Sequence, residues 1–553
     1  MLMKQEIYNE PRFTDFRQLI NHSADKYGKR IAFKIKTSDS YMYITYKQLK
    51  ERFYTLCNEF ISSGLLGKRI AIIGKNSFEW VLSYLAAATI GVAVPLDKEI
   101  HPDDAKAFME SAECEAICYG SSYAENIHTL LSENVKAFSF TEIMSMSEPA
   151  KSIDFSTVDN IKIEKDEMRV LIFTSGTTGS AKGVCLSQYN LCSNIHSTVS
   201  VVRIRQNDTT LSILPLHHTY ECTLDCLLIL SRGAMITYCD GVTEIAKNFV
   251  EYSPSILVVV PALLKLLNKR ITKSIIKSCP DKYKEFYKTE SLAEALRKTP
   301  YIIRKIICSK VRKSLGGRIR LFIVGAAELD TSLVDDFAEL GIRTLQGYGL
   351  TECSPLLAGN NDFYLNAAST GIAIPGVTLK IDNPNEAGVG EILAKGENIM
   401  LGYYKDQEAT DYVLRDGWFH TGDLGCMDPD GALYIKGRIK NVIVTQNGKN
   451  IYPEELENRL MQFPEIGEVL VLGSVQKDDI LVKAKIFPNL DVLKEKLGRL
   501  PSGEDIHAAI TDIIRDINKK IPTYKQIKET EILTNVLEKT TTQKIKRFGS
   551  NMK

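Results

Sequence analysis

The chain has 553 residues and a formal net charge of +1, with 44% hydrophobic and 25% charged residues. This length exceeds what one hydrophobic core organises, so we expect at least two domains. The composition is typical of a soluble globular protein, and the balanced charge argues against a general nucleic-acid binder. Twelve cysteines occur without a CxxC pair, which argues against zinc and redox motifs and favours a cytoplasmic setting.

Apolar strands and helices alternate along the first part of the chain. Residues 69–97 predict a strand, a turn, a helix and a second strand. The apolar run within them is shorter than the roughly 20 residues of a membrane span, so we expect a buried helix and strand. Apolar strands that lead into loops or helices recur at residues 168–176, 254–267 and 318–341. The alternation predicts an α/β fold with parallel sheets.

The pattern changes after about residue 370. Residues 390–406 and 431–445 are short, glycine-punctuated and alternating, which predicts antiparallel strands in a small β-barrel-like subdomain. A smaller α+β unit follows from about residue 440, with strands near 468–474 and 480–488 and a helix near 503–520. We place the boundary in the turn KGRIKN, which gives domains of residues 1–437 and 438–553.

Positive charge is concentrated in one interval. Between Lys265 and Arg320 there are 17 Lys and Arg against four Asp and Glu. In the same interval Ile302, Ile303, Ile306 and Val311 recur at roughly helical spacing. One interpretation is a basic helix that packs an apolar face on the core and exposes its charges. The alternatives are contact with an anionic membrane, an acidic carrier protein or an anionic cofactor.

Residues 173–183, FTSGTTGSAKG, follow an apolar strand with glycines, hydroxyls and one lysine. Backbone N–H groups, hydroxyl donors and Lys182 could together surround a chain of phosphates. Gly183 follows Lys182, so the segment is not a Walker A sequence, which requires Ser or Thr there. Taken alone, the loop could equally be a connector.

Four later segments carry candidate chemistry. In residues 345–355, LQGYGLTECSP, Tyr348 could stack a base, Thr351 offers a hydroxyl and Glu352 suits Mg²⁺. In residues 416–425, Asp423 is either a turn residue or an acceptor for ribose hydroxyls. The last two segments are residues 437–457 and 540–547, and the latter contains Lys544.

These five segments in this order resemble the adenylate-forming superfamily of acyl-CoA synthetases, peptide-synthetase adenylation domains and luciferases. The resemblance covers about residues 12–548. LPLHHTYE at 214–221, the long region before FIVGAAELD and the KIKR ending are most similar to bacterial long-chain fatty acid–CoA ligases. Ala181 stands where many members have proline, and Gln543 precedes Lys544 where the family commonly has SGK.

The resemblance implies a role for each site residue. ATP phosphates would contact Thr174, Ser175, Gly176, Thr177, Thr178, Gly179 and Lys182. Adenine would contact Gly325, Ala326, Ala327, Gln346, Gly347 and Tyr348. Asp423 and Arg438 would bind the ribose, Thr351 would contact the α-phosphate, and Glu352 with Thr178 would hold Mg²⁺. Lys440 would be the hinge residue, and His218 (or its neighbour His217) would lie at the acyl site. Lys544 would be the catalytic lysine.

The implied activity joins a fatty acid to coenzyme A at the expense of ATP. An acyl-adenylate and pyrophosphate would form first, with Mg²⁺ present, and a mobile C-terminal domain would then reorient for thioester formation. Three alternatives stay open: an acyl carrier protein as the acceptor, an aryl or other carboxylate as the substrate, and a non-catalytic nucleotide-binding protein. The intact Lys544, Glu352 and phosphate loop argue against the last.

Overall fold

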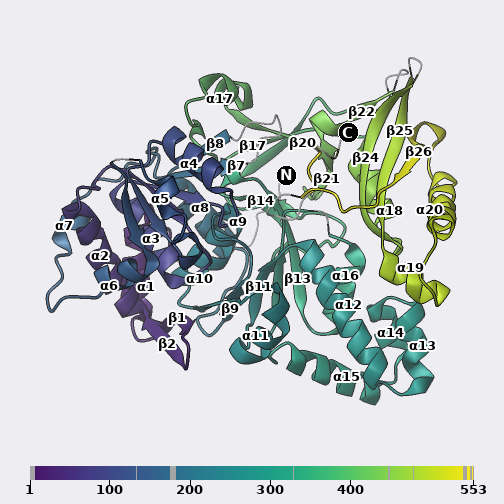
Figure 1. Ribbon diagram of the computed structural model, residues 1–553, viewed down its shortest axis with the longest axis horizontal. Coiled ribbons are helices and arrows are strands. Elements are labelled where there is room, and N and C mark those ends of the chain that lie inside the picture. Colours follow the sequence, from purple (N-terminus) through teal and green to yellow (C-terminus); the bar gives the residue numbers. More distant parts are fainter. Residues whose placement is uncertain are drawn as a thin grey trace.

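The structure is a computed structural model that describes residues 7–132, 134–174, 182–327, 329–445, 449–476, 479–539, 545–547 and 551. It is a mixed α/β fold with a large N-terminal domain and a small C-terminal one, which confirms the predicted fold class. Figure 1 shows the small C-terminal unit on the right, beyond β20 and β21.

The first sheet runs in the order β18-β8-β7-β4-β3-β5-β6. Its strands are β3 (Arg69–Ile73), β4 (Val92–Leu96), β5 (Ala116–Tyr119), β6 (Lys136–Ser139), β7 (Val170–Thr174), β8 (Lys182–Leu186) and β18 (Gly402–Tyr403). Pairing is parallel from β7 to β6 and antiparallel at β8 and β18. The helix α3 (Phe78–Ile90) joins β3 to β4 and is buried almost throughout, as the apolar run predicts. No helix among the described residues is long and apolar enough to cross a membrane.

The second sheet runs in the order β15-β14-β13-β12-β11-β9-β10-β1-β2. Its strands are β1 (Ile31–Lys36), β2 (Tyr41–Thr45), β9 (Thr209–Ser212), β10 (Met235–Tyr238), β11 (Ile256–Val259), β12 (Leu321–Val324), β13 (Arg343–Gly349), β14 (Leu356–Gly359) and β15 (Ile372–Ala373). The parallel register places Val259, Val324 and Gln346 side by side. The carboxyl ends of β11 and β12 therefore meet the second half of β13, where open α/β sheets bind their ligands.

Helices cover these sheets. They are α1 (Phe16–Tyr27), α2 (Tyr46–Ser62), α4 (Pro102–Ser111), α5 (Ile127–Leu130), α6 (Phe140–Met146), α7 (Ser156–Asp159), α8 (Gln188–Val199), α9 (Thr219–Glu221), α10 (Leu228–Ser231), α11 (Ile245–Tyr252), α12 (Pro261–Ser278), α13 (Asp281–Thr289), α14 (Leu292–Lys298), α15 (Tyr301–Ser314) and α16 (Thr331–Glu339). A buried π-helical turn, Cys222–Leu227, joins α9 to α10.

The predicted basic helix is α15, but its isoleucines do not share one face. Ile307 and Val311 are buried against the core, whereas Ile302 is 72% and Ile306 51% exposed. At 100° per residue, Ile302 and Ile306 lie on the opposite side of the helix from Val311. The helix does pack an apolar face on the core, through Ile303, Ile307 and Val311. The placement of Ile302 and Ile306 on that same face is wrong, because they lie on the solvent side.

The predicted antiparallel region forms a separate sheet. It contains β16 (Thr378–Asp382), β17 (Gly390–Lys395), β19 (Leu414–Arg415), β20 (Trp418–Met427) and β21 (Leu433–Arg438). The helix α17 (Gln407–Val413) lies between β18 and β19 along the chain. The strand pairs of this sheet are all antiparallel, as the alternating, glycine-punctuated pattern predicts.

The C-terminal part contains β22 (Ile443–Val444), β23 (Asn450–Ile451), α18 (Pro453–Leu460), β24 (Ile466–Gln476), β25 (Asp479–Pro488), α19 (Leu490–Leu497), α20 (Gly503–Asn518) and β26 (Ile527–Ile532). Ile510, Ile513, Ile514 and Ile517 recur at helical spacing on α20 and are buried. They belong to a hydrophobic cluster drawn from residues 443–527. This part therefore has a core of its own.

Candidate nucleotide site

Glu352 lies in a single 3₁₀ turn, Thr351–Cys353, directly after β13. Two amide groups, Asn194 Nδ2 and Asn398 Nδ2, donate to the Cys353 carbonyl at 3.3 and 2.9 Å. They also donate to the Leu356 carbonyl, at 2.8 and 2.9 Å. Segments distant in the sequence therefore fix the turn that presents the Glu352 side chain.

Tyr403 connects Glu352 to the end of the phosphate loop. Its hydroxyl donates to Glu352 Oε1 at 2.9 Å, and the Lys182 ammonium lies 4.7 Å from the centre of its ring. Burial and the nearby Glu352 raise the pKa of Tyr403, so its hydroxyl stays a donor. Glu352 Oε2 accepts no hydrogen bond from the residues that the structure describes, which leaves that oxygen available to a cation.

Asp423 is the second organised carboxylate. It is 5% exposed on β20, directly opposite Arg438 of β21. The Tyr348 hydroxyl donates to Asp423 Oδ2 at 2.8 Å, and Arg438 Nε lies 3.0 Å from Asp423 Oδ1. Tyr348 was expected to stack a base, and its hydroxyl additionally ties β13 to β20.

Positive groups from distant parts of the chain converge beside these carboxylates. Lys440 lies in the turn Ile439–Asn441. Its pKa is lowered by burial and then by Arg438 and Lys182, while Asp423 opposes the effect. Lys440 is thus close enough to Arg438 and to Lys182 to be repelled by both. A bound polyphosphate would offset that repulsion, so the residues fit an anionic nucleotide.

Gly325 directly follows β12, at the carboxyl end of the strand. The last residue of that strand, Val324, lies opposite the buried Gln346 of β13. A Cβ atom on Gly325 would lie 2.9 Å from Tyr220 Cε2. The Tyr220 hydroxyl donates to the carbonyls of Val259 and Ile323 at 3.2 and 3.0 Å. The next residue, Ala326, has a φ of 72°, which residues other than glycine adopt rarely. The tyrosine thus packs against a backbone surface that has room for glycine only.

The two adjacent histidines have different environments. His217 is buried, with Nε2 3.8 Å from Asp97 Oδ2, and burial lowers its pKa well below the ordinary value, so the ring is neutral at pH 7. His218 is half-buried immediately before α9, and the two ring centres are 4.0 Å apart. His218 is therefore the more accessible of the two.

Part of the predicted site lies outside the described residues. This applies to Ser175, Gly176, Thr177, Thr178 and Gly179, and to Lys544. Their flanks are described: Thr174 and Lys182 face each other across β7 and β8, and the Thr174 hydroxyl donates to the Lys182 carbonyl at 3.3 Å. Three further predicted residues are described. Thr351 directly precedes Glu352, Ala327 follows Ala326 and Gly347 precedes Tyr348.

Sequence reasoning missed Tyr403, Tyr220, Asn194 and Asn398. No sequence motif marks Tyr403, because its hydrogen-bond partner, Glu352, is 51 positions away. The buried Asn194 of α8 offers one usable signal, since an amide in a buried helix must find hydrogen-bond partners.

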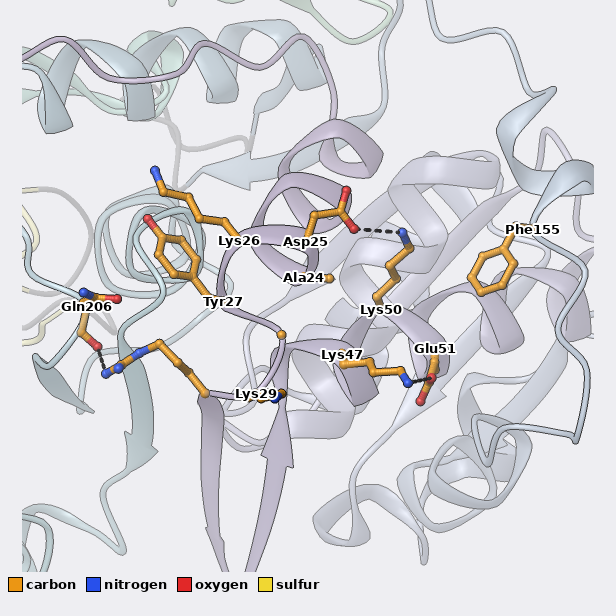
Figure 2. A pocket seen from close by; sticks show the side chains of 12 residues that line it. Ala24, Asp25, Lys26, Tyr27, Lys29, Lys47, Lys50, Glu51, Phe155 and Gln206 are labelled. Atoms are coloured by element: carbon orange, nitrogen blue, oxygen red, sulfur yellow. Dashed lines mark hydrogen bonds and ion pairs between the residues drawn. The ribbon is translucent and has the colours of Figure 1, made fainter.

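A surface hollow of about 710 Å³ lies elsewhere, at the end of α1 and the start of α2. Figure 2 shows charged side chains beside the rings of Tyr27 and Phe155 on its lining, where Lys50 pairs with Asp25 at 3.7 Å and Lys47 with Glu51 at 3.8 Å. None of the sequence-predicted site residues lines it. The candidate site is therefore the region around Glu352 and Asp423.

Comparison with known proteins connects this geometry to a family. A model described as "AMP-binding enzyme" matches residues 20–404, and one described as "AMP-binding enzyme C-terminal domain" matches residues 440–548. Long-chain-fatty-acid–CoA ligase 5 of Mus musculus is 27% identical over 544 residues, covering 89% of this chain and 79% of that protein. Long-chain-fatty-acid–CoA ligase FadD15 of Mycobacterium bovis is 26% identical over 526 residues, covering 87% and 86%.

Solved structures share the fold. ATP-bound MatB from Rhodopseudomonas palustris is 23% identical, with a TM-score of 0.75 over 96% of this chain and 97% of that chain. MenE from Bacillus subtilis, in complex with the acyl-adenylate intermediate OSB-AMP, is 21% identical, with a TM-score of 0.74 over 98% of each chain. Since the two family models together span most of the sequence, the chain belongs to the AMP-binding enzymes.

Proposed function

We propose that this protein is an ATP-dependent fatty acid–CoA ligase that forms an acyl-adenylate and then an acyl-CoA. The observation that carries the proposal is the convergence of Glu352 and Asp423, each held by a tyrosine, with Lys182, Arg438 and Lys440. The curated relatives described above, which are named as long-chain-fatty-acid–CoA ligases, support the substrate class.

We assign the site residues the roles that the resemblance to the adenylate-forming family implies. Asp423 and Arg438 would bind the ribose, the strand ends at Gly325 to Ala327 and Gln346 to Tyr348 would hold the adenine, and Thr351 would contact the α-phosphate. Thr174 to Gly179 and Lys182 would bind the β- and γ-phosphates. Glu352, with Thr178, would hold Mg²⁺, which supplies positive charge to the phosphates when it is bound.

The first step joins two anions. A carboxylate oxygen attacks the α-phosphorus of ATP, the bond to the β-phosphate oxygen breaks, and pyrophosphate leaves. Lys182, and Lys544 reaching in from the C-terminal domain, would offset the negative charge that collects in the transition state. Lys544 would bridge the carboxylate and the α-phosphate, and His218 would line the acyl pocket.

In the second step the CoA sulfur attacks the acyl carbon and AMP leaves. We propose that the domains divide at residues 437/438 and that the turn carrying Lys440 is the hinge. Rotation there would withdraw Lys544 and present the segment around Lys449 to the thiol. Lys182 and Arg438 repel the Lys440 ammonium. Bound phosphates would reduce this repulsion, so the position of the hinge would depend on whether phosphates are bound.

The test is a mass-spectrometric assay of the purified protein with ATP, Mg²⁺ and carboxylic acids from acetate to oleate. Aryl acids belong in the panel, because the fold is shared with an anthranilate CoA ligase and with MenE. CoA and a phosphopantetheine-loaded carrier protein serve as parallel acceptors. We expect acyl-CoA from the longer acids. Thioester on the carrier alone, products from aryl acids alone, or no product from any acid would contradict the proposal.

A further inference from the structure

The helix α15 presents an unusual face to solvent. Figure 1 shows it along the lower edge of the molecule, and it contacts α11 and α12 on its inner side. On the outer side Tyr301 is 67%, Ile302 72% and Ile306 51% exposed. The sequence left open whether these isoleucines pack on the core or face an anionic surface, and the fold exposes them.

Lysines share this outer face. Lys305, Lys310 and Lys313 are exposed and, at 100° per residue, fall within an arc of about 140° that also contains Ile302 and Ile306. None of the three lies within 4 Å of a carboxylate of the described residues, whereas Arg297 and Arg304 near the inner side both pair with Glu339. The outer lysines are therefore not used to stabilise the fold through ion pairs.

The adjoining helix adds charge of the same sign. Lys265, Lys269, Lys273 and Lys277 follow one another every fourth residue along α12 and are exposed. They too form no ion pair with the part of the chain that is described. Like charges at this spacing repel along a helix, so the row is electrostatically unfavourable unless an anionic surface lies near it.

We propose that the outer face of α15 docks on the surface of an anionic phospholipid bilayer. Tyr301, Ile302 and Ile306 enter the boundary between headgroups and acyl chains, and the lysines bind lipid phosphates. Exposed aliphatic side chains beside unpaired lysines are the combination that interfacial helices use. An acidic protein would also attract the lysines, and the experiment includes that outcome. The inference is independent of the acyl substrate.

The test is vesicle flotation of the full chain, with vesicles of phosphatidylcholine alone or mixed equally with phosphatidylglycerol. We expect binding to the mixed vesicles in 0.1 M NaCl and about tenfold weaker binding in 0.5 M NaCl. The variant K305E/K310E/K313E and the variant I302S/I306S should each bind at least about tenfold more weakly.

The matched control is K26E/K29E/K47E, which changes net charge equally but alters exposed lysines of the hollow in Figure 2. It should bind vesicles like the unmodified chain. Circular dichroism of all variants establishes that they are folded. The proposal would be overturned if the α15 variants bound vesicles as well as the unmodified chain, or if the control lost binding as much as they do. Binding to neutral vesicles alone would also overturn it, as would capture by an acidic carrier protein without vesicle binding.

Discussion

The Tyr403 hydroxyl donates a 2.9 Å hydrogen bond to Glu352, and this contact joins a two-residue strand to the carboxylate proposed to hold Mg²⁺. The same ring lies under the Lys182 ammonium, at 4.7 Å. One side chain thus contacts both the carboxylate proposed to hold Mg²⁺ and the lysine proposed to bind phosphate, although neither lies near it in the sequence.

Tyr403→Phe should therefore weaken use of MgATP. The substitution keeps the ring under Lys182 and removes only the hydrogen bond to Glu352, whose loss corresponds to about 1.5–3 kcal/mol for a charged acceptor. We expect kcat/KM for ATP to fall about tenfold or more, with the largest effect at limiting Mg²⁺. Tyr404→Phe, next along the chain, is the control. A Tyr403→Phe enzyme with an unchanged Mg²⁺ dependence would exclude this role.

Asp423→Asn should abolish tight ATP binding. It leaves Arg438 without its buried counter-charge, and the single amide oxygen can no longer accept from both Arg438 and the Tyr348 hydroxyl. We expect the Kd for ATP, measured by titration calorimetry, to rise about 100-fold. Tyr348→Phe retains the ion pair and should raise it less than tenfold. Equal effects of the two variants would show that the ion pair has no separate importance.

Gly325→Ala should destabilise the protein by about 1–3 kcal/mol, because its Cβ atom would meet the Tyr220 ring in a packed region. Urea unfolding measures this directly. Combining it with Tyr220→Leu should recover part of the loss, since the obstructing ring is gone. If the double variant is as unstable as the sum of the singles, the two residues do not interact as described.

The buried carboxyls of the π-helical segment make stability depend on pH. Burial raises the pKa of Asp225 to about 7, and burial together with Asp225 raises that of Glu221 well above its usual range. Both carboxyls therefore bind protons more tightly in the folded chain than in the unfolded one. Their contribution is present below the unfolded pKa, near 4, and is lost as pH rises toward 7 and above.

Thermal unfolding at pH 5.0 and pH 7.5 tests this sign. Asp225→Asn keeps the size of the side chain and cannot ionise, so the fall in Tm between the two values should be smaller in the variant. Asp512→Asn, an exposed site on α20, should leave the fall unchanged. A fall of the same size in Asp225→Asn would contradict the assignment.

Local patterns predicted the elements better than the contacts between them. The apolar run at 69–97 forms a helix and strands of the parallel sheet, and the helix predicted near 503–520 is α20, because hydrophobic period alone decides these elements. Asp423 and Glu352 could be singled out because their segments occur in a recognisable order. Tyr220 and Tyr403 could not, since each acts through neighbours that only the sheet topology brings near. The exposure of Ile302 and Ile306 could not be predicted for the same reason. Their spacing allows a buried face, and only the fold shows that the core lies on the other side of α15.

The most direct test of the account measures pyrophosphate exchange into ATP, dependent on fatty acid and without CoA. We expect exchange with the longer acids, a loss of about 100-fold or more in Lys544→Ala, and near-normal conversion of supplied acyl-adenylate to acyl-CoA by that variant. Absence of exchange with every acid, or an equal loss of both half-reactions in Lys544→Ala, would contradict the proposed adenylation chemistry or its assigned lysine.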